Sequence, residues 1–344
     1  METRAKDVKA KAKTARFTGA FANPAKAKTI KSKAPSLKIK KSKPSQTKVM
    51  WPKKTREIHN HHINSTVWNN FKFRDDDIVI ATYAKSGTTW TQQILAQLIF
   101  NGTEDTNVSQ LSPWLDFRLM PREVIEGLAT VPHRRFLKTH LPVDALVFSP
   151  SAKYLYVSRD GRDTVWSFFN HYANLTEERR EAMNTAPGLV GPPLPPCPAD
   201  PHQFYQTWFE ENGKPLWPYW ENIRSWWKVR HLPNVKLIHF DELKADLPGM
   251  IREIAQFLDV AIDEDRFTEI VGHCTFDYMK AHAERMAPRG GASWKGGAAT
   301  FINKGINGRW RGTLSKAEIR AYEAKALKEL GPACSKWLAQ GRTK

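Results

Sequence analysis

The sequence has few cysteines and no long apolar runs. Its 344 residues include only Cys197, Cys274 and Cys334, which are odd in number and far apart. They form no C-x-x-C pair, so neither a disulfide framework nor a zinc site is indicated, and this usage fits a reducing compartment. No stretch approaches the ~18 apolar residues that a membrane-spanning helix needs. We therefore expect a cytoplasmic protein without a membrane span.

Acidic residues are scarce in the first 57 residues, which carry most of the positive charge. The formal net charge is +18, yet residues 1–57 hold 18 Lys and Arg against 3 Asp and Glu, while the remaining 287 residues hold 35 against 32. Because this segment has few apolar residues and no helical period, we predict a disordered basic tail. Such a tail would bind nucleic acid or an anionic membrane weakly, or serve only as a solubilising extension. It lacks the apolar core of a secretory signal, whereas a transit peptide stays open.

Residues 58–344 have the composition of a globular α/β domain. Strand-like runs at residues 77–83, 154–157 and 235–240 are each followed by a polar turn and an amphipathic helix. Strands that alternate with helices indicate a parallel sheet flanked by helices. A capping box at Ser315 predicts a final helix, which Gly331 and the following proline should end. We find no internal repeats and predict a single domain.

The segment Thr82–Trp90 combines a strand end, a tight turn and a helix start. Backbone N–H groups at such a helix start bind anions, and Lys85 adds a cation. Ser86, Thr88 and Thr89 add hydroxyl groups. The segment is not a Walker A loop, because that motif needs its lysine after the second glycine. It therefore predicts a phosphate-binding loop, although a purely structural turn would look similar.

This loop resembles the 5′-phosphosulfate loop of the cytosolic-type sulfotransferases, T-Y-P-K-S-G-T-T-W, with Ala84 in place of the proline. Three further segments are similar to the family in the same order: Leu137–Pro142, Arg159 followed by Ser167, and Lys304–Trp310, which resembles the K-G-x-x-G-x-W lid. The resemblance covers about residues 65–315. It implies a P-loop-like α/β enzyme that moves a sulfuryl group from 3′-phosphoadenosine 5′-phosphosulfate (PAPS) to a hydroxyl or amine of a small molecule, with no metal.

The resemblance also implies a role for each matched residue. His140 would be the general base of an in-line transfer, and its side chain can take a proton near neutral pH. Lys85 and Lys138 would stabilise the charge that develops toward the leaving phosphate. The implied PAPS-binding set comprises Lys85, Ser86, Gly87, Thr88, Thr89, Trp90, Arg159, Ser167, Thr275, Phe276, Asn303, Lys304 and Gly305. Within it, Arg159 and Ser167 would contact the 3′-phosphate, and Trp90 and Phe276 the adenine.

Three departures from the family pattern affect these expectations. Asn303 stands where the lid usually has an arginine on the 3′-phosphate, so that contact should be weaker or replaced. Phe240 stands where a nucleotide-contacting tyrosine is common. The dimer motif K-x-x-x-T-V-x-x-x-E is not kept in residues 311–320, so the oligomeric state stays open.

The sequence does not identify the acceptor, but it predicts which segments line the acceptor pocket. We expect the acceptor pocket to be lined by Ser112–Arg122, Asn174–Pro201 and Gly290–Phe301. The Trp-rich stretch 208–227 should be helix packing, from which one or two side chains could reach the pocket. We interpret His59–His62 as a solvated surface run, because no carboxylate or cysteine completes a metal site there.

Two other functions compete with sulfuryl transfer. The first is a P-loop kinase or NTPase, which the missing Walker lysine position disfavours. The second is a non-catalytic protein that binds nucleotides or nucleic acid through its basic tail. The pair formed by Lys138 and His140 disfavours the second, since a pure binding protein needs no base there.

Overall fold

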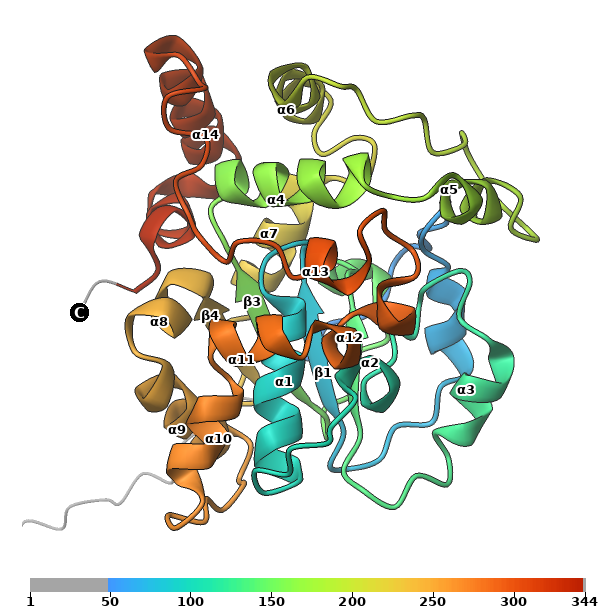
Figure 1. Cartoon of the computed structure of the whole chain (residues 1–344), viewed down its shortest axis with the longest axis vertical. Helices are drawn as coiled ribbons and strands as arrows, with labels where there is room; N and C mark the ends of the chain where they lie inside the picture. Colours follow the sequence, from blue (N-terminus) through green and yellow to red (C-terminus); the bar gives the residue numbers. More distant parts are fainter. Residues whose placement is uncertain (1–48, 343–344) are drawn as a thin grey trace, which may run out of the picture. The chain divides into compact units, whose positions relative to one another are not determined.

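The computed structural model describes residues 49–342 (Figure 1), so most of the predicted basic tail lies outside the described residues. The strands are β1 (Ile78–Thr82), β2 (Phe136–Thr139), β3 (Lys153–Ser158) and β4 (Val235–His239). Longer helices follow or connect them: α1 (Thr88–Ile99), α4 (Gly161–Ala173), α5 (Glu177–Asn184), α6 (Pro201–Glu210), α7 (Tyr219–Lys228), α9 (Leu247–Phe257) and α14 (Lys316–Gln340). Shorter elements are η1 (Ser65–Asn70), α2 (Val108–Leu111), α3 (Arg122–Gly127), η2 (Val143–Ala145), α8 (Phe240–Ala245), α10 (Phe267–His273), α11 (Phe276–Ala281), α12 (Ala283–Met286), η3 (Pro288–Gly291) and α13 (Gly297–Phe301).

The four strands form one parallel sheet in the order β2-β1-β3-β4. β1 is central: Ile80 is in register with Lys138 of β2 and with Leu155 of β3. All five of its residues are buried, as expected for a continuous apolar run covered on both faces. The expected α/β class and the three predicted strands are therefore confirmed. Because the strands are parallel, their carboxyl ends meet at one edge of the sheet, where ligands of such sheets bind.

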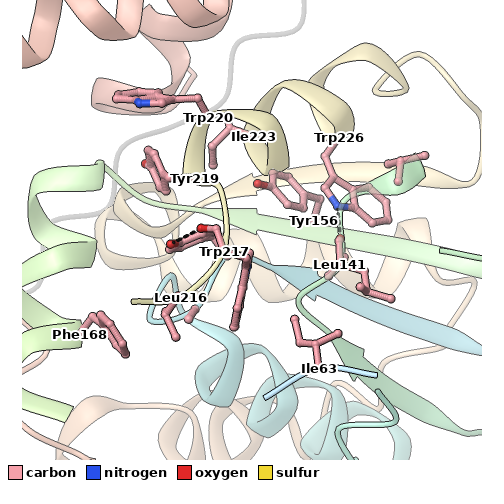
Figure 2. Close-up of a cluster of buried hydrophobic side chains, with 14 of the residues drawn as sticks. Ile63, Leu141, Tyr156, Phe168, Leu216, Trp217, Tyr219, Trp220, Ile223 and Trp226 are labelled. Atoms are coloured by element: carbon pink, nitrogen blue, oxygen red, sulfur yellow. Dashed lines mark hydrogen bonds between the residues drawn. The ribbon is translucent and has the colours of Figure 1, made fainter. Parts of the chain in front are cut away.

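Helices cover both faces of the sheet. Alternate residues of β1 face opposite sides: Ile78 and Ile80 pack into a core with α1, α9 and α10, whereas Val79 and Ala81 join the core formed with α4, α6 and α7. Figure 1 shows α1 in front of the sheet on the first side. On the second side lies the aromatic cluster of Figure 2, which includes Trp220 and Trp226 and where the indole Nε1 of Trp226 donates to Leu141 O at 3.0 Å. The Trp-rich stretch is thus helix packing, as predicted.

The folded part begins before the predicted boundary at residue 58. Thr55 N donates to Asp144 O at 2.8 Å, and Trp51 stacks against Phe148 with 6.1 Å between ring centroids. Arg56 forms ion pairs with Asp144 at 2.8 Å and with Glu221 of α7 at 2.9 Å. This correction has a simple cause: the basic residues nearest to the domain are paired with acidic side chains on its surface.

The last helix, α14, begins where the capping box predicted, but helical structure continues beyond the predicted end at Gly331. The Ser315 side chain caps α14 and accepts from Glu318 N, while the Glu318 side chain accepts from Ser315 N. At Gly331 the backbone leaves helical geometry, with φ 74° and ψ 170°, and a second helical segment continues from Pro332. Proline is favoured at the first position of a helix, so Pro332 starts this second segment instead of ending the helix. Within residues 49–342, no helix is both long and apolar enough to cross a membrane.

Candidate active site

A cavity of about 910 Å³ opens at the carboxyl edge of the sheet. The turns after all four strands contribute to it, through Lys85, His140, Arg159 and Phe240. Nearly all the predicted site residues line this one cavity, although they come from distant parts of the sequence: Lys85, Gly87, Thr88, Thr89, Trp90, Lys138, His140, Arg159, Ser167, Thr275, Phe276, Asn303, Lys304 and Gly305.

The exception is Ser86, which does not line the cavity. Its hydroxyl is fully buried and has no hydrogen-bond partner among the described residues. The neighbouring turn is compact: Gly87 has φ 112°, and a Cβ at this position would lie 3.1 Å from the Phe240 ring. Thr88 starts α1, and its hydroxyl hydrogen-bonds that of Thr82 at 2.8 Å. The first N–H groups of α1 therefore face a tight, glycine-dependent turn, which is the geometry of an anion site.

The surroundings of His140 favour one tautomer. Its Nδ1 lies 2.9 Å from the backbone oxygen of Thr82 and 3.0 Å from the hydroxyl of the same residue. A carbonyl only accepts, so Nδ1 satisfies this contact when it carries the hydrogen, and the hydroxyl can accept from it as well. In this tautomer Nε2 is unprotonated. The ring packs against Trp114 and Trp217, with centroid separations of 4.7 and 5.6 Å. Burial and the charges of Lys138 and Lys85 lower the pKa of His140 to about 3, so the imidazole is neutral at pH 7.

Three basic side chains gather around the phosphate-binding turn: Lys85 and Lys138 near His140, and Arg159 near Lys85. Burial, with the charges of Lys138 and Arg159, lowers the pKa of Lys85 to about 7. Burial lowers the pKa of Lys138 to about 8, although Asp116 opposes this shift. The Nζ of Lys85 lies 3.2 Å from Nδ1 of His171 and 4.8 Å from the centroid of the Phe301 ring. The cluster is therefore electrostatically strained and would be relieved by an anion.

The predicted lid segment closes over the end of β3. Arg159 donates from Nε to Oδ1 of Asn307 at 2.8 Å and from a terminal nitrogen to Ile306 O at 2.9 Å. Gly308 N donates to the Asp163 carboxylate at 2.6 Å. These bonds attach residues 306–308 to the start of α4, on the side where the phosphate-binding loop lies.

The predicted adenine-side residues lie together at this end of the cavity. Trp90 packs against Phe240 with 5.3 Å between centroids, and its Nε1 donates to Cys274 O at 2.8 Å. Phe276 is more than a third exposed and lies so close to Gly305 that a Cβ there would be 2.5 Å from its ring. Thr275 uses its hydroxyl within the protein, donating to Gly272 O at 2.8 Å and capping α11.

Sequence reasoning missed several residues of the cavity. His62 lines it and neighbouring His61 is 4% exposed, so the interpretation of His59–His62 as a solvated run is wrong. His61 is buried because its Nε2 hydrogen-bonds Pro215 O at 3.0 Å. Arg309 also lines the cavity, close enough to Arg159 for its charge to help lower the pKa of that guanidinium, after the larger effect of burial. In residues 49–342, no cluster of three His, Cys, Asp or Glu side chains is placed to hold a metal ion.

The other half of the cavity is mainly apolar and aromatic. All three loops expected around the acceptor contribute to it, including Phe117, Leu194 and Trp294. Trp217 from the Trp-rich stretch also reaches it. His140 therefore adjoins both kinds of surroundings, because it contacts the rings of Trp114 and Trp217 and lies near the charges of Lys138 and Lys85.

The described residues fit an anionic nucleotide in the cationic half. Lys85, Lys138 and Arg159 are brought close together, while Asp163 is the one carboxylate among the described lining residues and already accepts from Gly308 N. The buried, unpaired hydroxyl of Ser86 lies in the turn itself. A phosphate or sulfate group would supply the missing negative charge and hydrogen-bond acceptors.

The described domain is similar to known sulfotransferases. A family described as "Sulfotransferase domain" matches residues 75–331. A glycolipid sulfotransferase of Mycobacterium bovis is 30% identical over 298 residues, covering 80% of this chain and 91% of that protein. Sulfotransferase 1B1 of Mus musculus is 27% identical over 303 residues, covering 83% of this chain and 95% of that protein.

Solved structures share the fold. Mouse sulfotransferase SULT7A1 complexed with PAP superposes with a TM-score of 0.61 at 19% identity, covering 79% of this chain and 90% of that one. Retinol dehydratase in complex with androsterone and the inactive cofactor PAP superposes with a TM-score of 0.60 at 23% identity, covering 77% of this chain and 83% of that one. The family match and the sequence relatives confirm the expected PAPS-dependent enzyme and give no support to a kinase or a non-catalytic protein. The chain belongs to the sulfotransferase family.

Proposed function

We propose that this cavity transfers the sulfuryl group of PAPS in line to a hydroxyl or amine of a small-molecule acceptor, with His140 as the general base. The observation that carries the proposal is the position and state of His140. In the tautomer that the Thr82 carbonyl favours its Nε2 is unprotonated, and the ring contacts Trp114 and Trp217 while Lys138 and Lys85 lie close enough to lower its pKa.

The base is prepared by its surroundings. Nδ1 donates to the Thr82 carbonyl, which leaves the Nε2 lone pair to accept a proton from the acceptor. The two indole rings of Trp114 and Trp217 fix the plane of the imidazole. The low pKa keeps His140 neutral, and the proton that it accepts can pass on when product leaves.

Lys85 and Lys138 stabilise the leaving phosphate. PAPS supplies a sulfuryl group on a phosphate, and its cleavage leaves negative charge on the bridging oxygen. Cations fixed near that oxygen stabilise the charge without having to reorganise, and the low-dielectric cavity strengthens the effect. Lys85 contacts His171 in this structure, so nucleotide binding would exchange that contact for a phosphate oxygen.

Several residues would hold the nucleotide. The N–H groups of Gly87, Thr88 and Thr89 would bind the 5′-phosphate region. Ser86, whose buried hydroxyl does not line the cavity, would contribute only as part of the turn. Arg159 and Ser167 would bind the 3′-phosphate, with Asn303, Lys304 and Gly305 of the lid nearby. Trp90 and Phe276 would enclose the adenine, while Thr275 would contribute mainly by capping α11.

The basic segment 1–57 would act outside the transfer reaction. Its excess of lysine supports weak, salt-dependent binding to anionic surfaces or nucleic acid. Residues 51–57 pack on the domain, so this role would belong to the residues before them.

The proposal is tested by replacing His140 with glutamine. We expect kcat to fall by about 100-fold or more, because general-base catalysis contributes about 10²–10⁴ in rate. Affinity for 3′-phosphoadenosine 5′-phosphate (PAP), measured by calorimetry, should change less than about threefold, since His140 is the base rather than a phosphate ligand. The exposed His231 provides the matched control, and H231Q should leave both values unchanged. Near-normal turnover by H140Q would show that another group is the base.

A further inference from the structure

Two arginines without acidic partners lie in the acceptor half of the cavity. Arg179 of α5 and Arg289 of η3 both line it, and the Arg179 guanidinium lies 5.0 Å from the centroid of the Phe117 ring. Among the described residues, neither side chain forms an ion pair or a hydrogen bond. The next residue, Arg180, behaves differently, because its Nε donates to the Glu177 carboxylate at 3.1 Å.

The backbone holds the two arginines near one another. Leu175, just before α5, forms an antiparallel bridge with Trp294, just after η3. Thr176 N donates to Ser293 O at 3.0 Å, and Lys295 N donates to Asn174 O at 2.7 Å. These bonds join two segments more than a hundred residues apart, so the approach of the arginines is built into the fold rather than left to mobile side chains.

This part of the cavity has an excess of positive charge. Burial and the charge of Arg289 lower the pKa of Arg179. The single carboxylate among the described lining residues, Asp163, lies on the nucleotide side and accepts from the lid. Two guanidinium groups close together repel each other, and an oxyanion that binds both would remove that repulsion with charge-assisted hydrogen bonds.

The cavity wall around this pair is mainly apolar. Phe117, Met183, Leu194 and Trp217 line the cavity, and the one polar side chain close to both Arg179 and His140 among the described residues is His62, whose pKa is lowered by burial and by the charges around it. An acceptor that reaches from the base to the arginines must therefore carry an apolar body between two polar ends. Arg289 is exposed, which places the pair at the mouth of the cavity.

We propose that Arg179 and Arg289 bind an oxyanion of the acceptor, a carboxylate or a phosphate ester, so that the substrate class is an amphipathic hydroxy compound with an anionic end. This inference rests on the proposed function of the cavity. It adds a specificity site, remote from the reacting atoms, to the nucleotide site and the base.

The test uses the full chain with PAPS and a chain-length series of ω-hydroxy fatty acids. Their methyl esters provide neutral controls, and ω-hydroxyalkyl phosphates distinguish the two oxyanions. At the best chain length we expect kcat/KM to be at least about tenfold higher for the acid or the phosphate than for the ester, as one charge-assisted contact allows. In R179Q and R289Q this preference should fall to about twofold or less, with PAP affinity unchanged. R180Q should retain it.

Binding measurements separate the possible failures. Quenching of tryptophan fluorescence in the PAP-loaded H140Q variant reports acceptor binding without turnover, since Trp114 and Trp217 line the cavity. One outcome would overturn this inference alone: the protein binds PAP and sulfates a neutral phenol, but it shows no preference for the anionic acceptors in binding or in turnover. A protein that binds no PAP would overturn the proposed function as well. A preference that survives in both R179Q and R289Q would also exclude the arginine pair.

Discussion

At the scale of single residues, the proposed site depends on buried lysines whose charged forms are destabilised by their surroundings. Lys85 lies near both Lys138 and Arg159, and its pKa is lowered to about 7, while burial lowers the pKa of Lys138 to about 8 although Asp116 opposes that shift. Their charged forms become favourable when an anion arrives. Nucleotide binding and protonation should therefore be linked at this site.

The linkage predicts proton uptake when PAP binds. Around pH 7–8, part of the Lys85 and Lys138 population is neutral in the unliganded protein, and the phosphates raise both pKa values. PAP affinity should consequently fall as pH rises above about 7. Calorimetry in buffers of different ionisation enthalpy measures the uptake directly, and K85M should reduce it. Affinity that does not change between pH 6.5 and 8.5 would show that both lysines are already charged.

In this chain Asn303 stands where the family's lid usually has an arginine. Arg309 is the residue best placed to make the contact that this arginine would make. It lines the cavity, lies near Arg159 and has no ion pair within residues 49–342. We expect R309Q to weaken PAP binding about tenfold, which is about 1.4 kcal/mol, while binding of adenosine 5′-phosphate changes little. N303R should strengthen PAP binding. The matched control is R311Q, because Arg311 packs on Trp310 outside the cavity. Equal losses for both nucleotides would place Arg309 away from the 3′-phosphate.

The residues predicted from short motifs line one cavity, whereas individual lining residues supplied by distant loops were not predicted from the sequence. Lys85, His140 and Arg159 each follow a predicted or family-matched strand, so a parallel sheet necessarily brings them to one edge. Arg179 and Arg289 carry no local signal of function. Their proximity depends on the pairing of residues 174–176 with 293–295, which no periodicity or motif encodes.

At the scale of secondary-structure elements, the turn between β1 and α1 is the most constrained connection. Lys85 has φ 68° and Gly87 has φ 112°, so two residues of one turn occupy conformations that L side chains rarely adopt. Glycine at position 87 has a second reason, because Phe240 occupies the space that a Cβ would need. The turn therefore links α1 to the residue that follows β4.

Gly87 should not tolerate even a methyl group. We expect G87A to lower the free energy of unfolding by about 1–3 kcal/mol, through its positive φ and the 3.1 Å approach to Phe240, and to abolish PAP binding. Gly312 provides the control: its φ is 83°, but nothing lies within 4 Å of a Cβ there. G312A should lose about 1 kcal/mol and keep its PAP affinity. Urea unfolding and calorimetry measure the two effects, and normal PAP binding by G87A would contradict the proposed role of the turn.

Element types were easier to predict than their ends. The apolar runs at 77–83 and 235–240 became β1 and β4, yet Phe240 begins α8, because the His239 side chain caps that short helix. Gly331 breaks α14 as predicted, but Pro332 then starts a further helical segment whose Trp337 and Leu338 are buried in the core. Tertiary packing thus extended the helix beyond a local stop signal.

At the scale of the whole chain, the domain and the basic segment meet within residues 49–57. Thr55, Arg56 and Trp51 contact the domain although they lie in the stretch that composition assigned to the tail. Composition averages over a window, whereas the boundary is decided by individual side chains that find partners. The functional boundary should therefore lie before residue 51, and two truncations can locate it.

Removal of residues 1–48 should leave the enzyme intact, whereas removal of residues 1–57 should destabilise it. The longer deletion removes the Arg56 ion pairs with Asp144 and Glu221, the Thr55 hydrogen bond and the Trp51 packing. Such partly exposed contacts together contribute on the order of 1–3 kcal/mol, or several degrees in Tm. We expect the shorter deletion to keep the kcat and Tm of the full chain but to elute from heparin at lower salt, because it loses most of the excess lysine. Loss of turnover in the shorter deletion would instead assign the basic segment a part in catalysis, and equal Tm values for both deletions would restore the boundary at residue 58.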